Sequence, residues 1–319
     1  MQSTHQTTWP PGVRDHETIH RIHVKPADAG VAGFVDGGTL LDWIDKAAHG
    51  IATQWCGDNC VVASVGSLHL DRPIGVGEVV ELQASLVYTG RSSMHVLVTI
   101  HSSHTIRAKA IQTAQCPIVF VAVDDTGNPV EVPQWTPVTM LELQRQRQAR
   151  VRVRMRKRIE SAVAAQSYTA DGTAACITLR LHAADANSGG QVVRWIDEAA
   201  YRCGTDWAGA EVITSYIAGI RFYRPIAVGD AVEVTARIIH TGPRSIHLVV
   251  QVTSTDSQLA ADGLLVVVSL DERGGARPVP PWQPATDEDR RLDQHARHLI
   301  ELRQFNEPFT ISAAEVLPC

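Results

Sequence analysis

Two aspartates lie on otherwise apolar faces of predicted helices and could act as general bases. Asp45 stands beside Ile44, Ala47 and Ala48, so its carboxylate shares a helix with an apolar stripe. Burying a carboxylate there is costly, and partial desolvation would raise its pKa and make it a better base. Asp197 has matching surroundings in a second helix. A surface ion pair is the alternative role for either residue.

A glycine pair opens each of these predicted helices. Gly37-Gly38 precedes Asp45, and Gly189-Gly190 precedes Asp197. Glycine allows close backbone approach, and the first N–H groups of a helix have no partner within it. These N–H groups could therefore stabilise negative charge that develops on a reacting group. Close packing of the helix on a sheet is the alternative, and both roles can hold together.

The chain contains the same pattern twice, at a constant offset of 152 residues. Residues 37–50 and 189–202 share the glycine pair, the triplet Trp-Ile-Asp and two alanines. Further matches are Arg72-Pro73-Ile74 with Arg224-Pro225-Ile226, Val76-Gly77-Glu78 with Val228-Gly229-Asp230, Thr89-Gly90 with Thr241-Gly242, and His95 with His247. The register does not slip, which indicates a duplicated domain. A fused pair of like domains needs only one working site at its interface, so differences between the copies show which residues could change.

Composition limits the class of protein. A chain of 319 residues suits two domains, each large enough to bury a core. Its 44% hydrophobic and 20% charged residues are typical of soluble globular proteins, and no apolar run is long enough for a bilayer. We expect no signal peptide, and we expect reduced cytoplasmic thiols for the 6 cysteines. The net charge of -5 argues against a dedicated nucleic-acid binder.

Several chemistries lack their sequence signatures. There is no His and Cys cluster with metal-ligand spacing, no GxSxG nucleophile elbow and no phosphate-binding GxxxxGK[ST] loop. We therefore expect neither a metal nor a separate cofactor.

Each copy predicts one long helix followed by strands, an α+β layout with the helix laid across a curved antiparallel sheet. The helices begin near the glycine pairs. The expected strands after them are 61–70, 79–88, 94–101 and 108–123 in the first copy and 212–223, 231–240, 246–253 and 263–270 in the second. We expect these four strands to form a meander in each copy. A strand before each helix is expected at 18–24 and 174–181.

A polar segment with helical character follows each copy, at 139–160 and 287–304. The first carries eight basic residues between Arg145 and Arg158. A solvated linker helix is the interpretation that we favour, and a phosphate or nucleic-acid patch is the alternative. The predicted organisation is a first domain at 1–136, a basic helical linker at 137–170, a second domain at 171–283 and a helical tail at 284–319.

These motifs together resemble a known family. The second copy reads Asp185-Ala186-Asn187-Ser188 before its glycine pair, and the first has Asp28-Ala29-Gly30 before its own. A loop of type D-x-N, a glycine pair, and a helix with an acid near its second turn resemble the acyl-CoA thioesterase family with two fused hotdog domains. The resemblance covers residues 17–136 and 174–283. It implies an acyl-CoA hydrolase that releases coenzyme A and a carboxylic acid.

The resemblance also implies a site across the domain interface, with the loop asparagine from one copy and the helix acid from the other. Asn187 with Asp45 then forms the complete pair, and Gly30 with Asp197 lacks the asparagine. From Gly30 to Asp45 the spacing is 15 residues, as the family pattern requires, whereas from Asn187 to Asp197 it is 10. Asp45 would activate water, Asn187 would position water or substrate, and the helix start at Gly189 would polarise the thioester carbonyl. Direct attack by Asp45 is the alternative.

Further residues are candidates for substrate binding. Coenzyme A carries phosphates, so arginines at matched loops are candidates to face it, although a structural role is the alternative. These arginines are Arg72, Arg91, Arg224 and Arg244. Asp36, before the first glycine pair, is another candidate. His95 and His247 match between the copies, but their alternating surroundings favour ordinary sheet histidines.

Other functions stay open at the level of sequence. A non-catalytic acyl-CoA-binding or regulatory protein would explain Gly30 at the asparagine position and the short second loop. A hotdog hydratase or dehydratase would want a histidine near the active loop, and none follows Asn187 or Gly30. By resemblance we expect a cytoplasmic homo-oligomer, and a trimer of tandem chains is one assembly that the resemblance implies.

Overall fold

The structure is a computed structural model, and it describes residues 16–30, 33–57, 59–105, 108–164, 176–183, 189–224, 226–254, 258–270 and 276–304. The first repeat comprises β1 (Glu17–His23), a short 3-10 helix (Pro26–Asp28), α1 (Gly37–Cys56), β2 (Cys60–Val65), β3 (Leu68–His69), β4 (Val79–Thr89), β5 (Ser93–Ser103), β6 (Ile111–Ala122) and α2 (Met140–Ala164). The second comprises β7 (Cys176–His182), α3 (Gly189–Ala208), β8 (Val212–Phe222), β9 (Ala231–Thr241), β10 (Ile246–Ser254), β11 (Leu259–Ser269) and α4 (Asp287–Gln304). The expected α+β class is confirmed.

The strands of both repeats join in one antiparallel sheet with the order β1-β4-β5-β6-β2-β8-β11-β10-β9-β7, and β3 pairs with β8. Strands β2 and β8 meet at the centre, where Ser64 pairs with Arg221 and Val65 with Ile220. Pairing the two edges here removes two exposed strand edges. The expected meander is wrong for the strand after each helix. Strand β2 lies beside β6 and β8 lies beside β11, so the meander of each repeat is limited to three strands, β4-β5-β6 in the first and β9-β10-β11 in the second.

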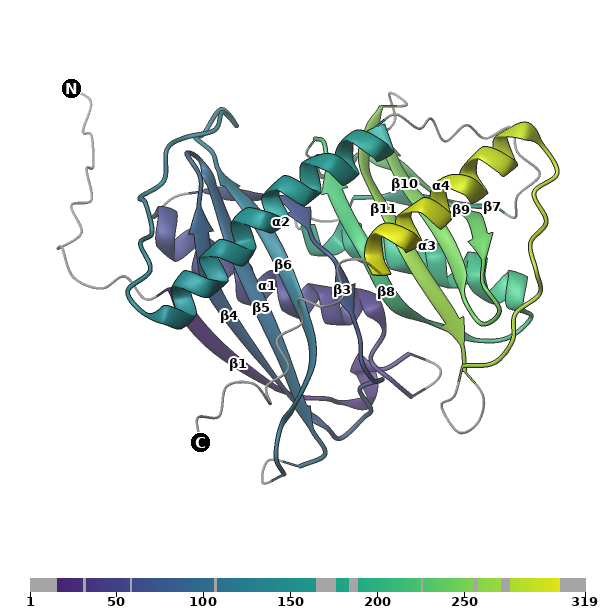
Figure 1. The fold of residues 1–319 in the computed structure, drawn as a ribbon, viewed down its shortest axis with the longest axis horizontal. Coiled ribbons are helices and arrows are strands. Elements are labelled where there is room, and N and C mark those ends of the chain that lie inside the picture. The colour runs from purple at the N-terminus through teal and green to yellow at the C-terminus, as the bar shows by residue number, and fades with distance from the viewer. Residues whose placement is uncertain are drawn as a thin grey trace.

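Helices α1 and α3 lie against one face of this sheet, behind it in Figure 1. The predicted stripe of α1 is buried, including Leu40, Ile44 and Ile51. The helix begins where the Asp36 side chain accepts a hydrogen bond from the Thr39 N–H, and it ends at a left-handed glycine. Sequence periodicity and capping therefore explain both the bounds and the buried face of this helix.

Helices α2 and α4 cross the opposite face, which is turned toward the viewer in Figure 1. Ala149 of α2 is buried with Val87 and Leu97 of β4 and β5. Leu292 and Ala296 of α4 are buried against the second repeat. The segment expected as a solvated linker helix thus buries one side on the first repeat. The sequence did not indicate this contact, because Ala149 is surrounded by charged and polar residues.

The basic residues at the start of α2 have local partners. Arg145 Nη1 donates to Glu17 Oε1 at 2.9 Å, and the Arg150 guanidinium lies 5.4 Å from the centre of the Tyr88 ring. Burial lowers the pKa of Arg152. These contacts are those of a helix fastened to a sheet.

Most strand bounds agree with the predictions within a few residues. The run expected at 61–70 is divided at Gly66, where a Cβ atom would lie 2.6 Å from Pro117 Cγ. Strand β6 begins later than expected, and β11 begins earlier. No helix among the described residues is both long and apolar enough to cross a membrane.

Candidate active site

The two glycine-opened helices pack on each other about an approximate two-fold axis. Asp42 of α1 and Arg194 of α3 are equivalent in the two repeats, and their side chains meet at 3.0 Å. The axis passes between them. Each helix therefore brings its aspartate to the start of the other helix, which places two related sites at the interface of the repeats.

The first of these, the Asp197 site, consists of Asp197, Thr214 and Gly38. Asp197 Oδ2 accepts a hydrogen bond from the Gly38 N–H at 2.8 Å, across the interface. Its Oδ1 accepts a hydrogen bond from Thr214 Oγ1, on strand β8, at 2.6 Å. Asp197 is 6% exposed, so both oxygens are satisfied within the protein.

The second, the Asp45 site, is formed by Asp45 and Gly190, and the residue equivalent to Thr214 is Val62. The Gly190 N–H hydrogen-bonds to the Asp45 carboxylate, as Gly38 does to Asp197. Val62 holds the position on β2 that Thr214 holds on β8, and it packs against the core. Val62 has no hydroxyl to donate. Accordingly, Asp45 Oδ1 is buried and has no hydrogen-bond partner among the described residues.

Both carboxyl groups hold protons more tightly than an ordinary aspartate. Burial raises the pKa of Asp45 to about 6, the charge of Asp42 adds to the rise, and the Gly190 N–H and Lys46 oppose it. Burial also raises the pKa of Asp197 to about 6, opposed by Thr214 and Gly38. A carboxylate with a pKa near 6 is ionised at neutral pH and is a stronger base than a free aspartate.

The glycines are required by close approach at this interface. A Cβ atom on Gly37 would lie 2.5 Å from Asp197 Oδ1 and 3.0 Å from Thr214 Cβ. A Cβ atom on Gly190 would lie 2.9 Å from Asp42 Oδ1. The glycine pairs therefore serve close packing, as the alternative reading expected. The neighbour that they approach is mainly the helix of the other repeat. The Gly38 N–H group also serves as a donor, but its acceptor is the protein carboxylate.

The loops before the helices differ. Asn187 falls in residues 184–188, outside the described residues, so its placement stays a prediction. Gly30 lies at the asparagine position of the first loop, where its N–H donates to the Phe34 carbonyl at 2.9 Å. Asp36 caps α1 and accepts from the Thr39 N–H at 2.6 Å. Its charge contributes to the raised pKa of Asp197.

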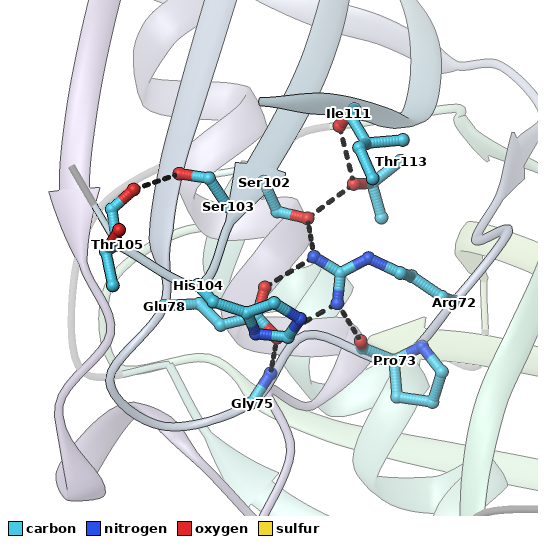
Figure 2. Close-up of polar contacts among 10 residues, drawn as sticks. All are labelled: Arg72, Pro73, Gly75, Glu78, Ser102, Ser103, His104, Thr105, Ile111 and Thr113. Atoms are coloured by element: carbon cyan, nitrogen blue, oxygen red, sulfur yellow. Dashed lines mark hydrogen bonds and ion pairs between the residues drawn. The ribbon is translucent and has the colours of Figure 1, made fainter. Parts of the chain in front are cut away.

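Arg72 has a different set of partners from the phosphate that the sequence suggested. Its guanidinium donates to both oxygens of Glu78, at 2.9 and 2.6 Å, and to Ser102 Oγ at 2.5 Å. Figure 2 shows this arrangement, with Glu78 also accepting from the Gly75 N–H. Glu78 is buried, and Arg72 lowers its pKa against the effect of burial. Arg72 therefore fastens the turn before β4, and a phosphate would have to displace Glu78.

The other matched arginines lie at the surface or near strand ends. Arg91 donates to Glu131 at 3.1 Å, and both side chains are exposed. Arg244 is exposed in the turn between β9 and β10, and Arg224 follows β8 with intermediate burial. His95 and His247 lie beside Ser93 and Ser245 within their strands. This agrees with ordinary sheet histidines.

Thr214, Val62, Asp42 and Arg194 were missed by the sequence reading. All four are mismatches at equivalent positions of the two copies, whereas the sequence pattern rests on residues that match. The signal that could have revealed the strand pair was a polar residue in one copy, Thr214, at the position of an apolar residue in the other, Val62. Within the described residues there is no group of three or more His, Cys, Asp or Glu side chains that could hold a metal ion.

A helix laid on an antiparallel sheet, repeated and joined edge to edge with acids at the helix–helix interface, defines a double hotdog protein. The thioesterase superfamily pattern matches residues 32–109 and 188–261. The chain is 31% identical over 130 residues to a Bacillus subtilis protein named as an uncharacterized acyl-CoA thioester hydrolase, covering 41% of this chain and 76% of that one. This chain therefore belongs to the thioesterase superfamily and contains two tandem hotdog domains.

Two longer matches span both repeats. The chain is 24% identical to the cytosolic acyl coenzyme A thioester hydrolase of Mus musculus, covering 90% of this chain and 83% of that protein. An acyl-ACP thioesterase from Bacteroides thetaiotaomicron, known from a crystal structure, is 9% identical and has a TM-score of 0.54, covering 79% of this chain and 98% of that one. At that identity the second match shows the shared fold alone.

Proposed function

We infer that this chain is an acyl-CoA thioesterase, which uses water to convert an acyl-CoA into a carboxylic acid and free coenzyme A. The inference rests on its membership of the superfamily and on relatives named as acyl-CoA thioester hydrolases. The interface carboxylates supply chemistry that fits this reaction. Since the mouse relative is named as cytosolic, we propose a cytoplasmic enzyme.

We propose that Asp45 is the general base. The observation that carries this proposal is its Oδ1 atom, which is buried and finds no partner among the described residues. A buried polar atom without a partner is costly, and such atoms in native proteins often serve a bound water or substrate. Asp45 Oδ1 can accept a proton from water as the water oxygen attacks the thioester carbon. The raised pKa of Asp45 suits this transfer near neutral pH.

The start of α3 supports the same site. A helix N-terminus stabilises negative charge, so it favours the oxyanion that forms as the carbonyl is attacked. Asn187 precedes this helix in sequence, and we propose that it positions the water or the thioester. Asp197 has both oxygens occupied, by Gly38 and Thr214, and we propose that it chiefly holds the interface.

The decisive experiment follows thiol release from short, medium and long acyl-CoA esters. Asp45→Asn should lower kcat by about a thousandfold, within the range for a lost general base. Asp197→Asn is the matched control because it removes the equivalent charge from the other site. If Asp197→Asn is the inactive variant, the working site is the Asp197 site. Binding of acyl-CoA without turnover by the unmodified protein would favour the acyl-CoA-binding alternative.

In a single turnover run in oxygen-18 water, entry of the label into the Asp45 carboxylate would replace the general-base step by direct attack. We also propose that tandem chains associate into a homo-oligomer, with one or more of Arg91, Arg224 and Arg244 near the phosphates of coenzyme A. A solution mass equal to that of one chain would reject the oligomer.

A further inference from the structure

The helix pair at the centre of the molecule carries charges that are reversed between the repeats. Asp42 on α1 is equivalent to Arg194 on α3, and the two meet at 3.0 Å on the approximate two-fold axis. Four residues later, Lys46 on α1 is equivalent to Glu198 on α3. Two equivalent positions therefore have opposite signs in the two helices, although Lys46 pairs with Asp42 and Glu198 pairs with Arg202 within their own helices.

The contact is close, so the charges cannot easily move apart. Asp42 has a side chain that is 13% exposed, and its Oδ2 accepts from Lys46 at 2.7 Å as well as from Arg194. A Cβ atom on Gly38 would lie 3.3 Å from both Cα and Cγ of Arg194. The backbone of each helix thus presses on the charged residue of the other.

An axis of this kind brings equivalent residues together. If two first repeats paired in this way, Asp42 would face a second Asp42, and two second repeats would set Arg194 against Arg194. Like charges at such a distance in a partly desolvated interface repel, whereas unlike charges attract. Reversed charges at equivalent positions are a known means of excluding wrong pairings.

We propose that the reversed charges at positions 42 and 194 specify pairing of a first repeat with a second repeat. The surface of α1 around Asp42 is an interaction surface whose fitted partner is α3 of the other repeat. Pairing between like repeats of two chains is disfavoured. Larger assemblies are then built from intact tandem units, and the interface sites are always formed from unlike repeats.

Single substitutions in the full chain reproduce the two disfavoured pairings. Arg194→Asp sets Asp opposite Asp, and Asp42→Arg sets Arg opposite Arg. We expect Asp42→Arg to lower the melting temperature by about 4 °C and Arg194→Asp by about 2 °C. The positive charge of Lys46 beside position 42 reduces the repulsion between two aspartates but adds to the repulsion between two arginines. The double variant Asp42→Arg/Arg194→Asp restores opposite charges and should melt above both single variants.

The neutral double variant Asp42→Asn/Arg194→Gln separates repulsion from simple loss of an ion pair. An ion pair whose arginine side chain is 52% exposed contributes little by itself, so this variant should melt within about 1 °C of the unmodified chain. A charge-exchanged double variant that melts at or below the less stable single variant would overturn the proposal. The readout is thermal unfolding, so the result does not depend on which site hydrolyses the thioester, or on whether either does.

Discussion

The two interface sites share a backbone arrangement and differ at one strand position. At the Asp197 site, Thr214 donates to the carboxylate, and both oxygens are satisfied. At the Asp45 site, Val62 stands at the equivalent position, and one buried oxygen finds no partner among the described residues. A single methyl-for-hydroxyl difference therefore accompanies the contrast between a carboxylate with both oxygens hydrogen-bonded and one with a buried oxygen that no described residue meets.

Duplication makes this difference permissible. In a symmetric homodimer each substitution changes both sites, so a stabilising change in one would also be imposed on the other. In a fused chain, Thr214 can satisfy Asp197 while Val62 leaves Asp45 Oδ1 without a donor. The Asp197 site can then stabilise the interface and offset the cost of a buried, unsatisfied carboxylate at the Asp45 site.

The largest expected effect on stability tests how tightly the Asp197 site is built. Gly37→Ala places a methyl group 2.5 Å from Asp197 Oδ1 and 3.0 Å from Thr214 Cβ, so the interface must open. We expect a loss of about 3 kcal/mol in the free energy of unfolding, at the upper end for overpacking. Denaturant unfolding measures it. Gly50→Ala in the same helix meets nothing within 4 Å and should stabilise by about 0.5 kcal/mol. Equal stabilities for the two variants would mean that the Asp197 site is loosely packed.

A smaller effect is expected from making the Asp197 site resemble the Asp45 site. Thr214→Val keeps the shape of the side chain and removes the donor to Asp197 Oδ1. Leaving that buried oxygen without a donor should cost about 2 kcal/mol of stability at neutral pH, because the ionised carboxylate loses a hydrogen bond. Unfolding in urea would measure the cost. A fall in kcat as large as that of Asp45→Asn would instead move the working site to Asp197.

The sequence predicted the elements of the fold well because the local signals agreed. Apolar periodicity, glycine pairs and strand runs fixed α1, α3 and most strands within a few residues, and the duplication at constant offset implied paired sites. The place of β2 beside β6 and β8 was not predictable in this way, since strand order depends on contacts between segments distant in sequence. The buried side of α2 was missed because one alanine among many charges gives almost no periodic signal.

Within the site, the sequence identified the aspartates and glycines that the structure brings together. It did not predict that Gly38 and Gly190 would donate to the aspartates of the opposite repeat, because that contact depends on how two helices cross. It left Arg72 open between a phosphate contact and a structural role, because the turns that bring Arg72 to Glu78 could not be positioned from sequence. Asn187 lies outside the described residues, so its role stays a prediction.

The most sensitive test gives the Asp45 site the hydroxyl that it lacks. Val62→Thr would let a hydroxyl donate to Asp45 Oδ1, and a donated hydrogen bond stabilises the ionised carboxylate and lowers its pKa from about 6. If Asp45 must be ionised to act, kcat/KM of the unmodified enzyme falls below about pH 6, and in Val62→Thr that fall should move about one unit lower. The weaker base and the occupied oxygen should also reduce kcat by about tenfold at pH 8.

Val62→Ala is the matched control for this last variant, because it alters the packing beside Asp45 without adding a donor. The fall of its kcat/KM at low pH should occur at the same pH as in the unmodified enzyme, whatever happens to its stability. If the low-pH fall of kcat/KM is unmoved in Val62→Thr as well, Asp45 is not the group whose titration controls the rate. The two interface sites would then differ in structure without differing in chemistry, and the hydroxyl of Thr214 would have to be explained by stability alone.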